Sequence, residues 1–466
     1  MNFIDVRESA KKWNLEERRV TALCRNGRIA GAKKENGKWM IPENASKPID
    51  ARTKEYNSNL DKSNNFIPYQ KAIESIDVLK AFEKIYLRSP DATEFTPYRV
   101  CPIGAHSDHQ LGKITGFAIN KGIHIAYSIK HTGIIEICSL QFSKRAQWHV
   151  NATPVQKQND WADYLRGATI SLSKRYNLKF GICAVISGEL PIGGLSSSAA
   201  VIITFLSALA RVNGIVLSDE EIINLSKEAE NLYVGVACGK LDQSCEVYSK
   251  KNHLLYMDFL DESYELIPIN PNMKPFKIAI FFSGVERTLA GSAFNMRVDE
   301  CRSAAYALKA YAGMPYGKFA ETNLREVPFE IYEKYKHMLP ESWRKRAAHW
   351  YTEFFRVQKG AQAFRNGDIE TFGKLCFESG NSSIYQWETG SPELKTLYQI
   401  MTETEGIYGG RFSGAGFKGC CMALIDPSFE QSIKENVTAK YLKAFPELKN
   451  NFSVHFCDSA DGVKMK

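Results

Sequence analysis

The chain has 466 residues, of which 44% are hydrophobic and 24% charged, which is the composition of an ordinary folded protein of two or three domains. It excludes a disordered or collagen-like chain, and no apolar run approaches the roughly 18 residues that a membrane span needs. The polar first residues do not resemble a secretion signal, and eleven cysteines without a CxxC pair predict reduced thiols in the cytoplasm.

The first fifty residues predict a small basic module. Residues 1–54 carry +6 of the total net charge of +8, so the rest of the chain is nearly neutral. Asp5 with Glu8 and Asn14 with Glu17 have the spacing of capping boxes, in which each pair satisfies the first N–H groups of a helix. We therefore expect two short helices, which end near residues 13 and 25.

A basic hairpin is predicted to follow these helices, because Asn36-Gly37 is a strong two-residue turn signal. This order of elements, a helix, a turn, a second helix and a hairpin, resembles that of the small winged helix-turn-helix domains of excisionase-like and MerR-like proteins. The resemblance implies DNA as a partner, and a docking or dimerisation module is the alternative. The implied phosphate contacts are Arg18, Arg19, Arg25, Lys33, Lys34 and Lys38.

Residues 51–66 are polar and aperiodic, which predicts a linker. Beyond it, ITGFAINKGIHIAYSIK and GIIEICSLQF predict strands and hairpins, and HLLYMDF and FKIAIFFS predict buried strands. AAVIITFLSALARVNG, EEIINLSKEAENLY and RAAHWYTEFFRVQKGAQAFRNG predict helices, the last of them ended by Asn366-Gly367. The mixed order of strands and helices predicts an α+β body.

Three segments of this body carry residue types that phosphate chemistry needs. Pro191–Ala200, PIGGLSSSAA, places glycines and serines before an apolar helix, where backbone N–H groups can hold an anion. Gly409–Cys421 has five glycines and must pass close to another backbone or a ligand. Pro97–Gly112 holds an arginine, two histidines and an aspartate, but no further His/Cys cluster has the spacing of a structural metal site.

These segments, in this order, resemble the three signature motifs of the GHMP kinases, and within that superfamily those of galactokinase. Cys238–Gln243, CGKLDQ, matches the family's CGxxDQ segment, and the resemblance covers about residues 85–466. It implies an α+β, two-lobed GHMP kinase fold with the active site between the lobes, preceded by the small winged helix-turn-helix domain. The expected divisions are a module at 1–50, a linker at 51–66, an N-terminal lobe at 67–272 and a C-terminal lobe at 273–466.

The resemblance also implies a role for each matching residue. Asp242 would lie beside the sugar's C1 hydroxyl as base or orienting charge, and Arg99 would pair with it and stabilise transferring charge. A purely structural ion pair is the alternative for these two. ATP would bind the phosphate loop, with Mg²⁺ held by Ser197 and Glu230. The implied loop residues are Gly193, Gly194, Leu195, Ser196, Ser197, Ser198 and Ala199, and the implied sugar contacts are Ala105, His106, Asp108, His109 and Gly239.

The sequence departs from galactokinase at several of these positions. Ala105 replaces a glutamate, His109 a tyrosine and Cys101 an asparagine, Phe294 stands where the sugar site has a tyrosine, and the phosphate loop is one residue shorter. RVCPIGAHSDHQLG, RVDEC, KRAAHWY and YGGRFSGAGFKGCC resemble the plant galacturonokinase branch instead.

The substrate prediction depends on Ala105. The resemblance to galactokinase-like sites implies that a glutamate at this position lies close to the sugar's C6 group. It would repel the C6 carboxylate of a uronic acid by about 4 kcal/mol at 4 Å near a protein surface. The alanine removes this repulsion and predicts D-galacturonate as the substrate, with D-galactose as the alternative. A sugar-sensing, DNA-binding regulator with a kinase-like body is an alternative of another class, which the intact Asp242 and Arg99 disfavour.

Overall fold

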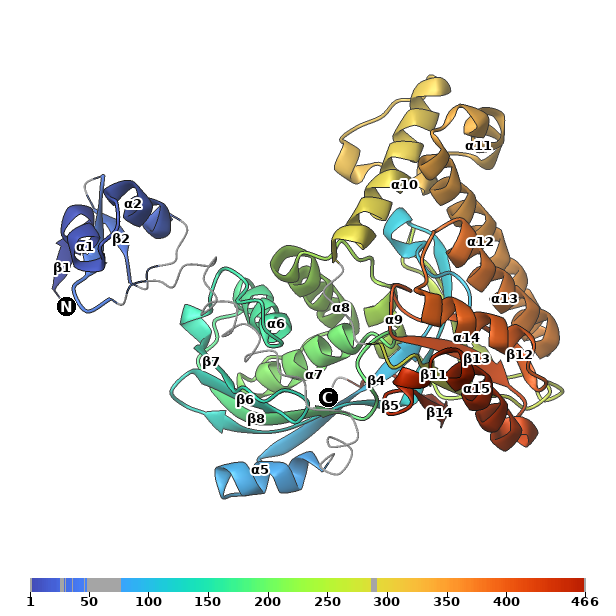
Figure 1. The fold of residues 1–466 in the computed structure, drawn as a ribbon, viewed down its shortest axis with the longest axis horizontal. Helices are drawn as coiled ribbons and strands as arrows, with labels where there is room; N and C mark the ends of the chain where they lie inside the picture. The colour runs from blue at the N-terminus through green and yellow to red at the C-terminus, as the bar shows by residue number, and fades with distance from the viewer. Residues whose placement is uncertain are drawn as a thin grey trace. The chain divides into compact units, whose positions relative to one another are not determined.

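The computed structural model describes residues 2–25, 29, 31–35, 37–45, 47, 77–285 and 291–464. These residues fall into two compact units, which divide between residues 65 and 66 (Figure 1). The predicted linker at 51–66 lies outside the described residues. In the part of the chain that is described, no helix is both long enough and apolar enough to cross a membrane.

The first unit is a three-stranded antiparallel sheet with two helices. Strands β1 (Phe3–Asp5), β3 (Lys38–Pro42) and β2 (Lys33–Glu35) lie in that order, and α1 (Val6–Trp13) and α2 (Glu17–Arg25) pack on them. Both predicted helices and the predicted hairpin are therefore present. A small apolar core, which includes Trp13, Val20 and Ile41, holds the unit together.

The two predicted helix caps have different outcomes. The Asp5 carboxylate accepts a hydrogen bond from the Glu8 N–H at 2.8 Å, so the first cap is confirmed. The second is wrong, because Asn14 ends α1 instead of opening α2. It adopts the left-handed conformation with φ 51°, and its N–H bonds the carbonyls of Ala10 and Lys11. Asparagine tolerates this conformation better than most residues, which makes it a suitable C-cap.

The second unit begins with an eight-stranded sheet in the order β10-β9-β5-β8-β6-β7, with β4 and β15 also paired to β5. Among the described residues of this sheet, only the β6–β8 pairing is parallel. The helices described with this sheet include α7, which follows the phosphate loop, and α9, which follows CGKLDQ. The strands are β4 (Ala92–Val100), β5 (Lys113–Lys130), β6 (Ile134–Ser139), β7 (Ala146–His149), β8 (Gly181–Gly188), β9 (His253–Asp258), β10 (Tyr264–Pro268) and β15 (Ser459–Ala460), and the helices are α5 (Val78–Tyr86), α6 (Asp163–Ser173), α7 (Ser197–Val212), α8 (Asp219–Glu228) and α9 (Leu241–Tyr248).

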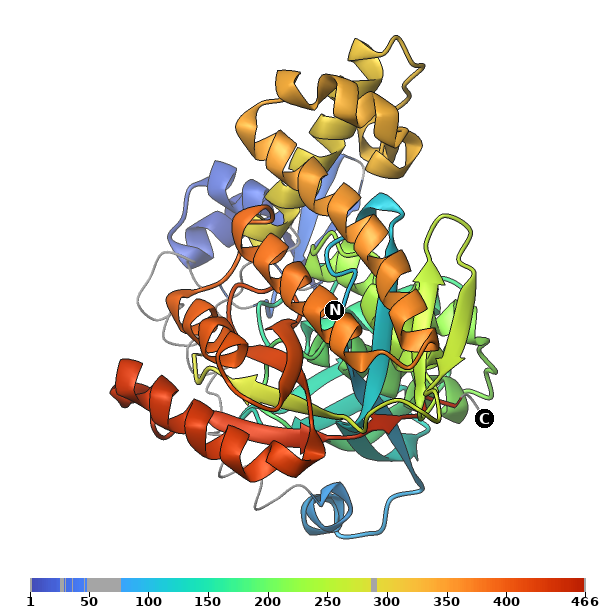
Figure 2. The ribbon, with the colours of Figure 1, turned by 90° about the vertical axis from the view of Figure 1, so that its right-hand side faces the viewer.

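A four-stranded antiparallel sheet, β12-β13-β11-β14, forms the rest of the second unit together with six helices. Figure 2 shows the long helices α12 and α13 side by side. Helix α12 ends at Arg365, and Gly367 follows with φ 77°, as predicted. The strands are β11 (Lys277–Phe282), β12 (Ile407–Phe412), β13 (Cys420–Ile425) and β14 (Ser453–Cys457), and the helices are α10 (Gly291–Tyr311), α11 (Phe329–Tyr335), α12 (Glu341–Arg365), α13 (Ile369–Tyr385), α14 (Pro392–Thr402) and α15 (Glu430–Ala444).

One apolar core connects the two sheets of the second unit. It includes Ile125 and Ile186 from the first sheet and Ile280 and Met422 from the second. The α+β body expected from the order of strands and helices is therefore present. Because the core is continuous, segments from both sheets keep fixed positions where the sheets meet.

Candidate active site

The phosphate loop and the third glycine-rich segment pack against each other, backbone to backbone. A side chain at Gly414 would come within 2.9 Å of the Gly194 Cα, and one at Gly419 within 2.8 Å of the Gly193 carbonyl carbon. Gly193 and Gly194 also have positive φ angles of 130° and 89°, which glycine adopts at little cost. The glycines therefore allow the close approach that the sequence led us to expect, and they fix the loop that precedes α7.

The N-terminus of α7 is open for an anion. The helix begins at Ser197, and no side chain caps it. Ser196, the preceding residue, has a left-handed backbone and a buried hydroxyl without a hydrogen-bond partner among the described residues. The first-turn N–H groups of a helix have no partners within the helix and carry the positive end of its dipole. Ser198 and Ala199 continue the first turn.

Arg99 and Asp242 form a close ion pair between β4 and the first turn of α9. Nε and Nη2 of Arg99 lie 2.8 and 2.7 Å from the same oxygen, Oδ1 of Asp242. Nη1 donates to the carbonyl of Gly194 at 3.1 Å, which joins the pair to the phosphate loop. Burial alone would lower the pKa of Arg99, but the Asp242 carboxylate raises it above its ordinary value. The arginine is therefore a permanent positive charge.

The second carboxylate oxygen of Asp242 remains available. Oδ2 accepts no hydrogen bond from any residue that the structure describes, and the side chain is 27% exposed, whereas that of Arg99 is 4% exposed. Arg99 thus orients the carboxylate from behind while one oxygen faces outward. This arrangement suits a carboxylate that accepts a hydrogen bond or a proton from a bound hydroxyl.

Asp108 and Gly239 touch directly. Oδ2 of Asp108 accepts the N–H of Leu241 at 3.0 Å, and a side chain at Gly239 would come within 2.1 Å of the same oxygen. Burial raises the pKa of the Asp108 carboxyl. Asp108, His109 and Gly239 line one cavity of about 160 Å³, to which Arg302 also contributes. Three of the predicted sugar contacts therefore share one cavity.

His106 and His109 belong to a cluster of aromatic rings. His106 stacks on Trp387 with ring centres 4.8 Å apart and planes 7° apart. His109 lies 5.6 Å from Trp387, and it meets Phe294 edge to face at 6.0 Å. His349 of α12 lies 5.4 Å from Trp387. These rings come from four places in the chain: the loop after β4, α10, α12 and the segment after α13. Because these places are far apart in the sequence, the sequence pattern did not predict that the rings would lie together.

Several ring nitrogens of this cluster are buried without hydrogen bonds. Nε2 of His106, both ring nitrogens of His109 and Nε1 of Trp387 have no partner within the described ranges. Burial lowers the pKa of His106 well below its ordinary value and that of His109 to about 3. Both rings are therefore neutral at pH 7, and each carries one N–H. Buried polar groups are nearly always paired, so these four nitrogens are available to hydrogen-bond a bound molecule.

Two residues of α12 hold the backbone of Gly104 and Ala105. Oε1 of Glu353 accepts the Gly104 N–H at 2.6 Å, and Nε2 of His349 lies 3.0 Å from the carbonyl of Ala105. Glu353 and His349 are fully buried, and Ala105 is nearly so. The sequence reasoning missed both α12 residues. Their signal is a histidine and a glutamate four residues apart on the apolar face of a helix, where polar side chains need a partner.

Glu230, the predicted magnesium ligand, lies in a short π-helix (Ala229–Val234) and is buried. Nε2 of Gln243 donates to its Oε2 at 2.7 Å, and the Cys238 thiol donates to the same oxygen at 3.5 Å. Within the described part of the chain, no group of three or more His, Cys, Asp or Glu side chains could hold a metal ion. Cys101, which replaces the motif's asparagine, is buried in an apolar cluster with Ala105 and Cys245.

Comparisons with known proteins show the family to which the chain belongs. The family models for the N-terminal and C-terminal domains of GHMP kinases match residues 163–250 and 361–443. Galacturonokinase of Arabidopsis thaliana is 37% identical over 393 residues, which cover 79% of this chain and 92% of that protein. Galactokinase of Thermotoga maritima is 31% identical over 369 residues, which cover 79% and 98%.

The same fold occurs in a solved galactokinase. The crystal structure of Lactococcus lactis galactokinase complexed with galactose superimposes with a TM-score of 0.75 at 23% sequence identity, and the match covers 84% of this chain and all of that one. Both halves of a GHMP kinase are thus present in one polypeptide. The chain belongs to the galactokinase family of the GHMP kinases, and it is a phosphotransferase that uses an alcohol group as acceptor.

Proposed function

We propose that this enzyme transfers the γ-phosphoryl group of ATP to the anomeric hydroxyl of D-galacturonate. The observation that carries the choice of sugar is Ala105, which lies in the first motif where galactokinases have a glutamate. Its neighbour His106 and the nearby ring of Trp387 offer uncharged N–H groups instead of a carboxylate. The 37% identity to a galacturonokinase supports the same choice.

The proposed reaction uses the Arg99–Asp242 pair. The C1 oxygen of the sugar forms a bond to the γ-phosphorus while the bond from that phosphorus to the bridging oxygen of ADP breaks. The C1 hydroxyl proton passes to Oδ2 of Asp242, or to the transferred phosphoryl group if Asp242 acts only as an orienting charge. Arg99 stabilises the negative charge that develops during transfer, and its bond to the Gly194 carbonyl keeps it beside the phosphate loop.

The phosphates of ATP would bind at the loop from Gly193 to Ser198 and at the N-terminus of α7. The oxygen donors at the start of α7 and on Glu230 fit Mg²⁺, which prefers hard oxygen ligands and keeps several waters and phosphate oxygens. We therefore propose that Ser197 and Glu230 hold Mg²⁺, which would neutralise charge on the nucleotide phosphates. Gln243 fixes the Glu230 carboxylate by its hydrogen bond at 2.7 Å.

For the sugar, we propose contacts from Asp108 and Gly239 to the ring hydroxyls and from the loop at Ala105 to the C6 group. A C6 carboxylate can accept several hydrogen bonds, and the free nitrogens of His106, His109 and Trp387 could donate them without an added charge. The CH₂OH group of galactose has a single oxygen, so it can accept fewer hydrogen bonds from these nitrogens than a carboxylate can. Galactose nevertheless remains the alternative substrate.

Two substitutions at Ala105 separate charge from size. Ala105→Glu should lower kcat/KM for galacturonate by roughly a thousandfold, from about 4 kcal/mol of repulsion. Ala105→Gln has the same size without the charge, and it should lower kcat/KM for galacturonate and galactose by similar factors. Wild-type preference for galactose, or equal galacturonate turnover by the Glu and Gln variants, would reject galacturonate as the substrate. Absence of ATP consumption with every free hexose, pentose and uronic acid tested would favour the regulator alternative.

We further propose that residues 1–50 form a winged helix-turn-helix that binds DNA. The observation in favour is the order of α1, α2 and the hairpin β2–β3, on which Lys33, Lys34 and Lys38 are exposed. Arg18 and Arg19 of α2 are exposed as well, although Arg18 pairs with Glu16 and Lys33 with Glu35. Lys34 and Lys38 are therefore the better candidates for phosphate contacts.

A gel-shift series with the DNA upstream of the protein's own coding region tests this proposal. Binding should weaken steeply as salt rises, because bound lysines release counterions. Lys34→Gln with Lys38→Gln should weaken binding and flatten the salt dependence, whereas the control pair Lys11→Gln with Lys12→Gln on α1 should not. Absence of binding at low salt would favour the docking or dimerisation role.

We propose that the two lobes divide between residues 272 and 273. Strand β10 of the first sheet ends at Pro268 and β11 of the second begins at Lys277, although β15 returns to the first sheet.

We also propose that the protein works in a reducing compartment such as the cytoplasm. All eleven cysteines carry free thiols, and ten of them are buried.

A further inference from the structure

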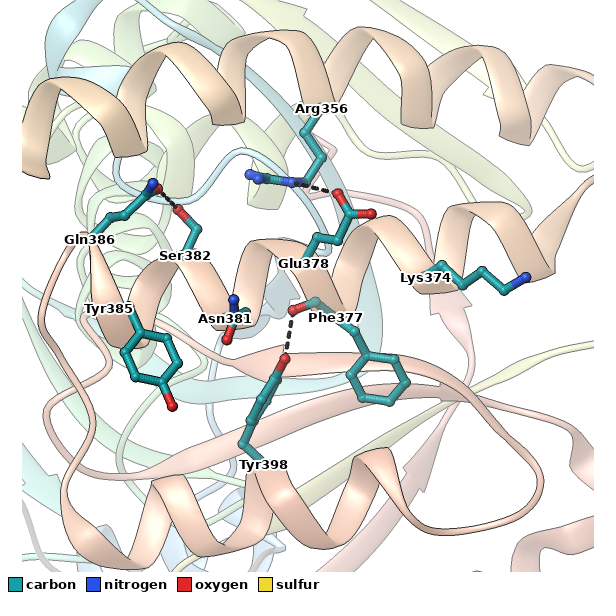
Figure 3. Close-up of a pocket in the computed structure, with 9 residues that line it drawn as sticks. All are labelled: Arg356, Lys374, Phe377, Glu378, Asn381, Ser382, Tyr385, Gln386 and Tyr398. Atoms are coloured by element: carbon teal, nitrogen blue, oxygen red, sulfur yellow. Dashed lines mark hydrogen bonds and ion pairs between the residues drawn. The ribbon is translucent and has the colours of Figure 1, made fainter.

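Two cavities of the second unit differ in how their positive charges are paired. A groove of about 600 Å³ between α12, α13 and α14 is lined by none of the predicted active-site residues. Figure 3 shows the carboxylate of Glu378 between Arg356 and Lys374, and Arg356 is also paired with Glu353. Arg356 and Lys374 therefore do not converge on a common ligand.

The smaller cavity, of about 160 Å³, lies at the predicted sugar contacts and carries a positive charge. Its charged lining residues are Asp108, Lys227, Lys240, Glu262 and Arg302. Three cations and two carboxylates give this lining a net charge of +1 when Asp108 is ionised. Lys240 is paired with Glu262, whereas Lys227 has no ion pair within the described part of the chain. The cavity therefore favours a negatively charged ligand.

Arg302 is the cation of this cavity that is directed toward the aromatic cluster. It lies on α10 about two turns after Phe294, whose ring meets His109 edge to face. Its Nη1 donates to Oδ1 of Asp299 at 3.0 Å, so the side chain runs back along the helix toward Phe294. Burial and the charge of Arg302 together lower the pKa of His109 to about 3. The guanidinium thus lies within electrostatic reach of the His109 ring.

The guanidinium of Arg302 keeps donors free for a ligand. Asp299 contacts it only through Nη1, and the Asp299 side chain is 59% exposed, whereas that of Arg302 is 25% exposed. Such exposed ion pairs contribute little, so Asp299 is a weak competitor. Nε and Nη2 of Arg302 have no partner among the residues that the structure describes. These two groups can donate parallel hydrogen bonds to one carboxylate.

A uronic acid in this site requires such a cation. The N–H groups of His106, His109 and Trp387 can hydrogen-bond a C6 carboxylate, but they carry no charge. Buried charges are stable when they are paired, so uncharged donors leave the charge of the carboxylate uncompensated. Ala105 removes a repulsion and supplies no attraction. The neutral CH₂OH group of galactose has no such requirement.

We infer that Arg302 binds the C6 carboxylate of the sugar and thereby selects uronic acids over neutral hexoses. This inference rests on the proposed sugar kinase function and names a specificity-determining residue of the same site. Nε and Nη2 of Arg302 donate to the two carboxylate oxygens, and the uncharged N–H group of His109 adds a further hydrogen bond.

Lys227 provides a matched control, because it lines the same cavity with the same charge. Burial raises the pKa of Asp108, and the charge of Lys227 acts in the opposite direction on that carboxyl. Lys227 is therefore close to the residue that we propose to bind ring hydroxyls. A general electrostatic effect of the cavity would depend on both cations, whereas a direct contact with C6 depends on Arg302 alone.

Equilibrium binding tests the contact without turnover. D-galacturonate and D-galactose are titrated by calorimetry into the full chain as wild type, Arg302→Gln, Arg302→Lys and Lys227→Gln. Arg302→Gln should weaken galacturonate binding about 10- to 100-fold, as expected for hydrogen bonds to a charged group, and change galactose binding by less than about twofold. Arg302→Lys, which keeps the charge without the fork, should recover part of the loss. Lys227→Gln should weaken galacturonate binding by less than about threefold.

Three results of the titration would overturn the inference. They are equal losses for the two sugars in Arg302→Gln, equal losses of galacturonate binding in Arg302→Gln and Lys227→Gln, and a wild type that does not bind galacturonate.

Steady-state kinetics separate this inference from the proposed function. The ratio of kcat/KM for galacturonate to kcat/KM for galactose should fall about 10- to 100-fold in Arg302→Gln, while KM for ATP and the melting temperature stay unchanged. A wild type that turns over galacturonate, with the same ratio in Arg302→Gln, would reject the role of Arg302 alone. A wild type that turns over no galacturonate would reject the proposed substrate, and the titration would still show whether Arg302 binds the carboxylate.

Discussion

Asp242 is the side chain on which the chemistry depends most directly. Because both contacts from Arg99 go to Oδ1, the carboxylate is held while Oδ2 stays free. Asp242→Asn keeps the shape and removes the charge, so kcat should fall by about 10²–10⁴, the usual contribution of an acid–base group. The measurement is kcat by ADP release, alongside ATP affinity and the melting temperature. A variant that folds, binds ATP and retains near wild-type kcat would remove Asp242 from the mechanism.

Substitution of Gly239 should impair sugar binding instead of turnover. A methyl group at this position would lie 2.1 Å from Oδ2 of Asp108, so the carboxylate must move away from the Leu241 N–H. Gly239→Ala should therefore raise KM for the sugar by at least about tenfold, the loss expected when a charge-assisted hydrogen bond is displaced.

The control for this substitution is Gly317→Ala, because a side chain at Gly317 meets nothing within 4 Å. Both variants should be purified as folded protein and compared in KM for sugar and in KM for ATP. An unchanged sugar KM in Gly239→Ala would show that Asp108 does not contact the sugar.

The sequence predicted those active-site side chains that lie within short signature segments. Arg99 and Asp242 are 143 positions apart, but each lies within a recognisable segment, so their pairing followed from the family resemblance. Glu353 lies in a long helix outside these segments, His349 lies in KRAAHWY, which the resemblance linked to no role, and Trp387 follows another helix. Their contacts with Gly104, Ala105 and His106 depend on tertiary packing, which local spacing does not encode.

Among the secondary-structure elements, α12 makes the stability of the fold sensitive to pH through His349. Burial lowers the pKa of His349 to about 4, whereas an unfolded histidine has a pKa of about 6.5. Below pH 6.5 the unfolded chain takes up a proton that the folded chain does not. The free energy of unfolding should therefore fall by about 1.4 kcal/mol for each pH unit between 6.5 and 4 from this residue alone.

Urea unfolding at pH 7.5, 6.5 and 5.5 measures this slope. His349→Gln removes the titrating group and should reduce the slope by about 1.4 kcal/mol per pH unit below pH 6.5. Its lower stability at pH 7.5 does not affect the comparison, and Glu353, whose pKa burial would raise but Arg356, His349 and Arg411 lower, stays ionised over this pH range. Identical slopes in the two proteins would mean that His349 is not neutral in the fold.

Strand β5 shows why element boundaries were harder to predict than element types. The stretch ITGFAINKGIHIAYSIK was predicted to form strands and hairpins, yet β5 runs through it as one strand of 18 residues. It pairs with β9 at residues 113–116 and with β8 at residues 123–130, while β4 follows most of its length. Strands β8 and β9 lie far away in the sequence, so local spacing does not encode the pairing that keeps β5 continuous.

The architecture of the second unit explains why its motifs are spread along the chain. The phosphate loop follows β8 of the first sheet, and the third glycine-rich segment joins β12 to β13 of the second. The two segments are in contact at Gly194 and Gly414. The Arg99–Asp242 pair lies on the first-sheet side and touches the same loop. The site can therefore form only when both sheets are folded, which favours a single cooperative kinase unit.

Removal of residues 1–65, which make up the first compact unit, should leave the second unit intact. Among the described residues, the apolar cluster of the first unit contains residues between 4 and 45, and the clusters of the second contain residues from 78 onward. The truncated chain, which begins at Phe66, should therefore keep kcat/KM for galacturonate within about twofold of the full chain and unfold in the same main transition. Its DNA binding should be lost if the module carries it. A large fall in kcat/KM, with the melting temperature unchanged, would mean that the N-terminal module acts on the kinase, and it would reject their functional independence.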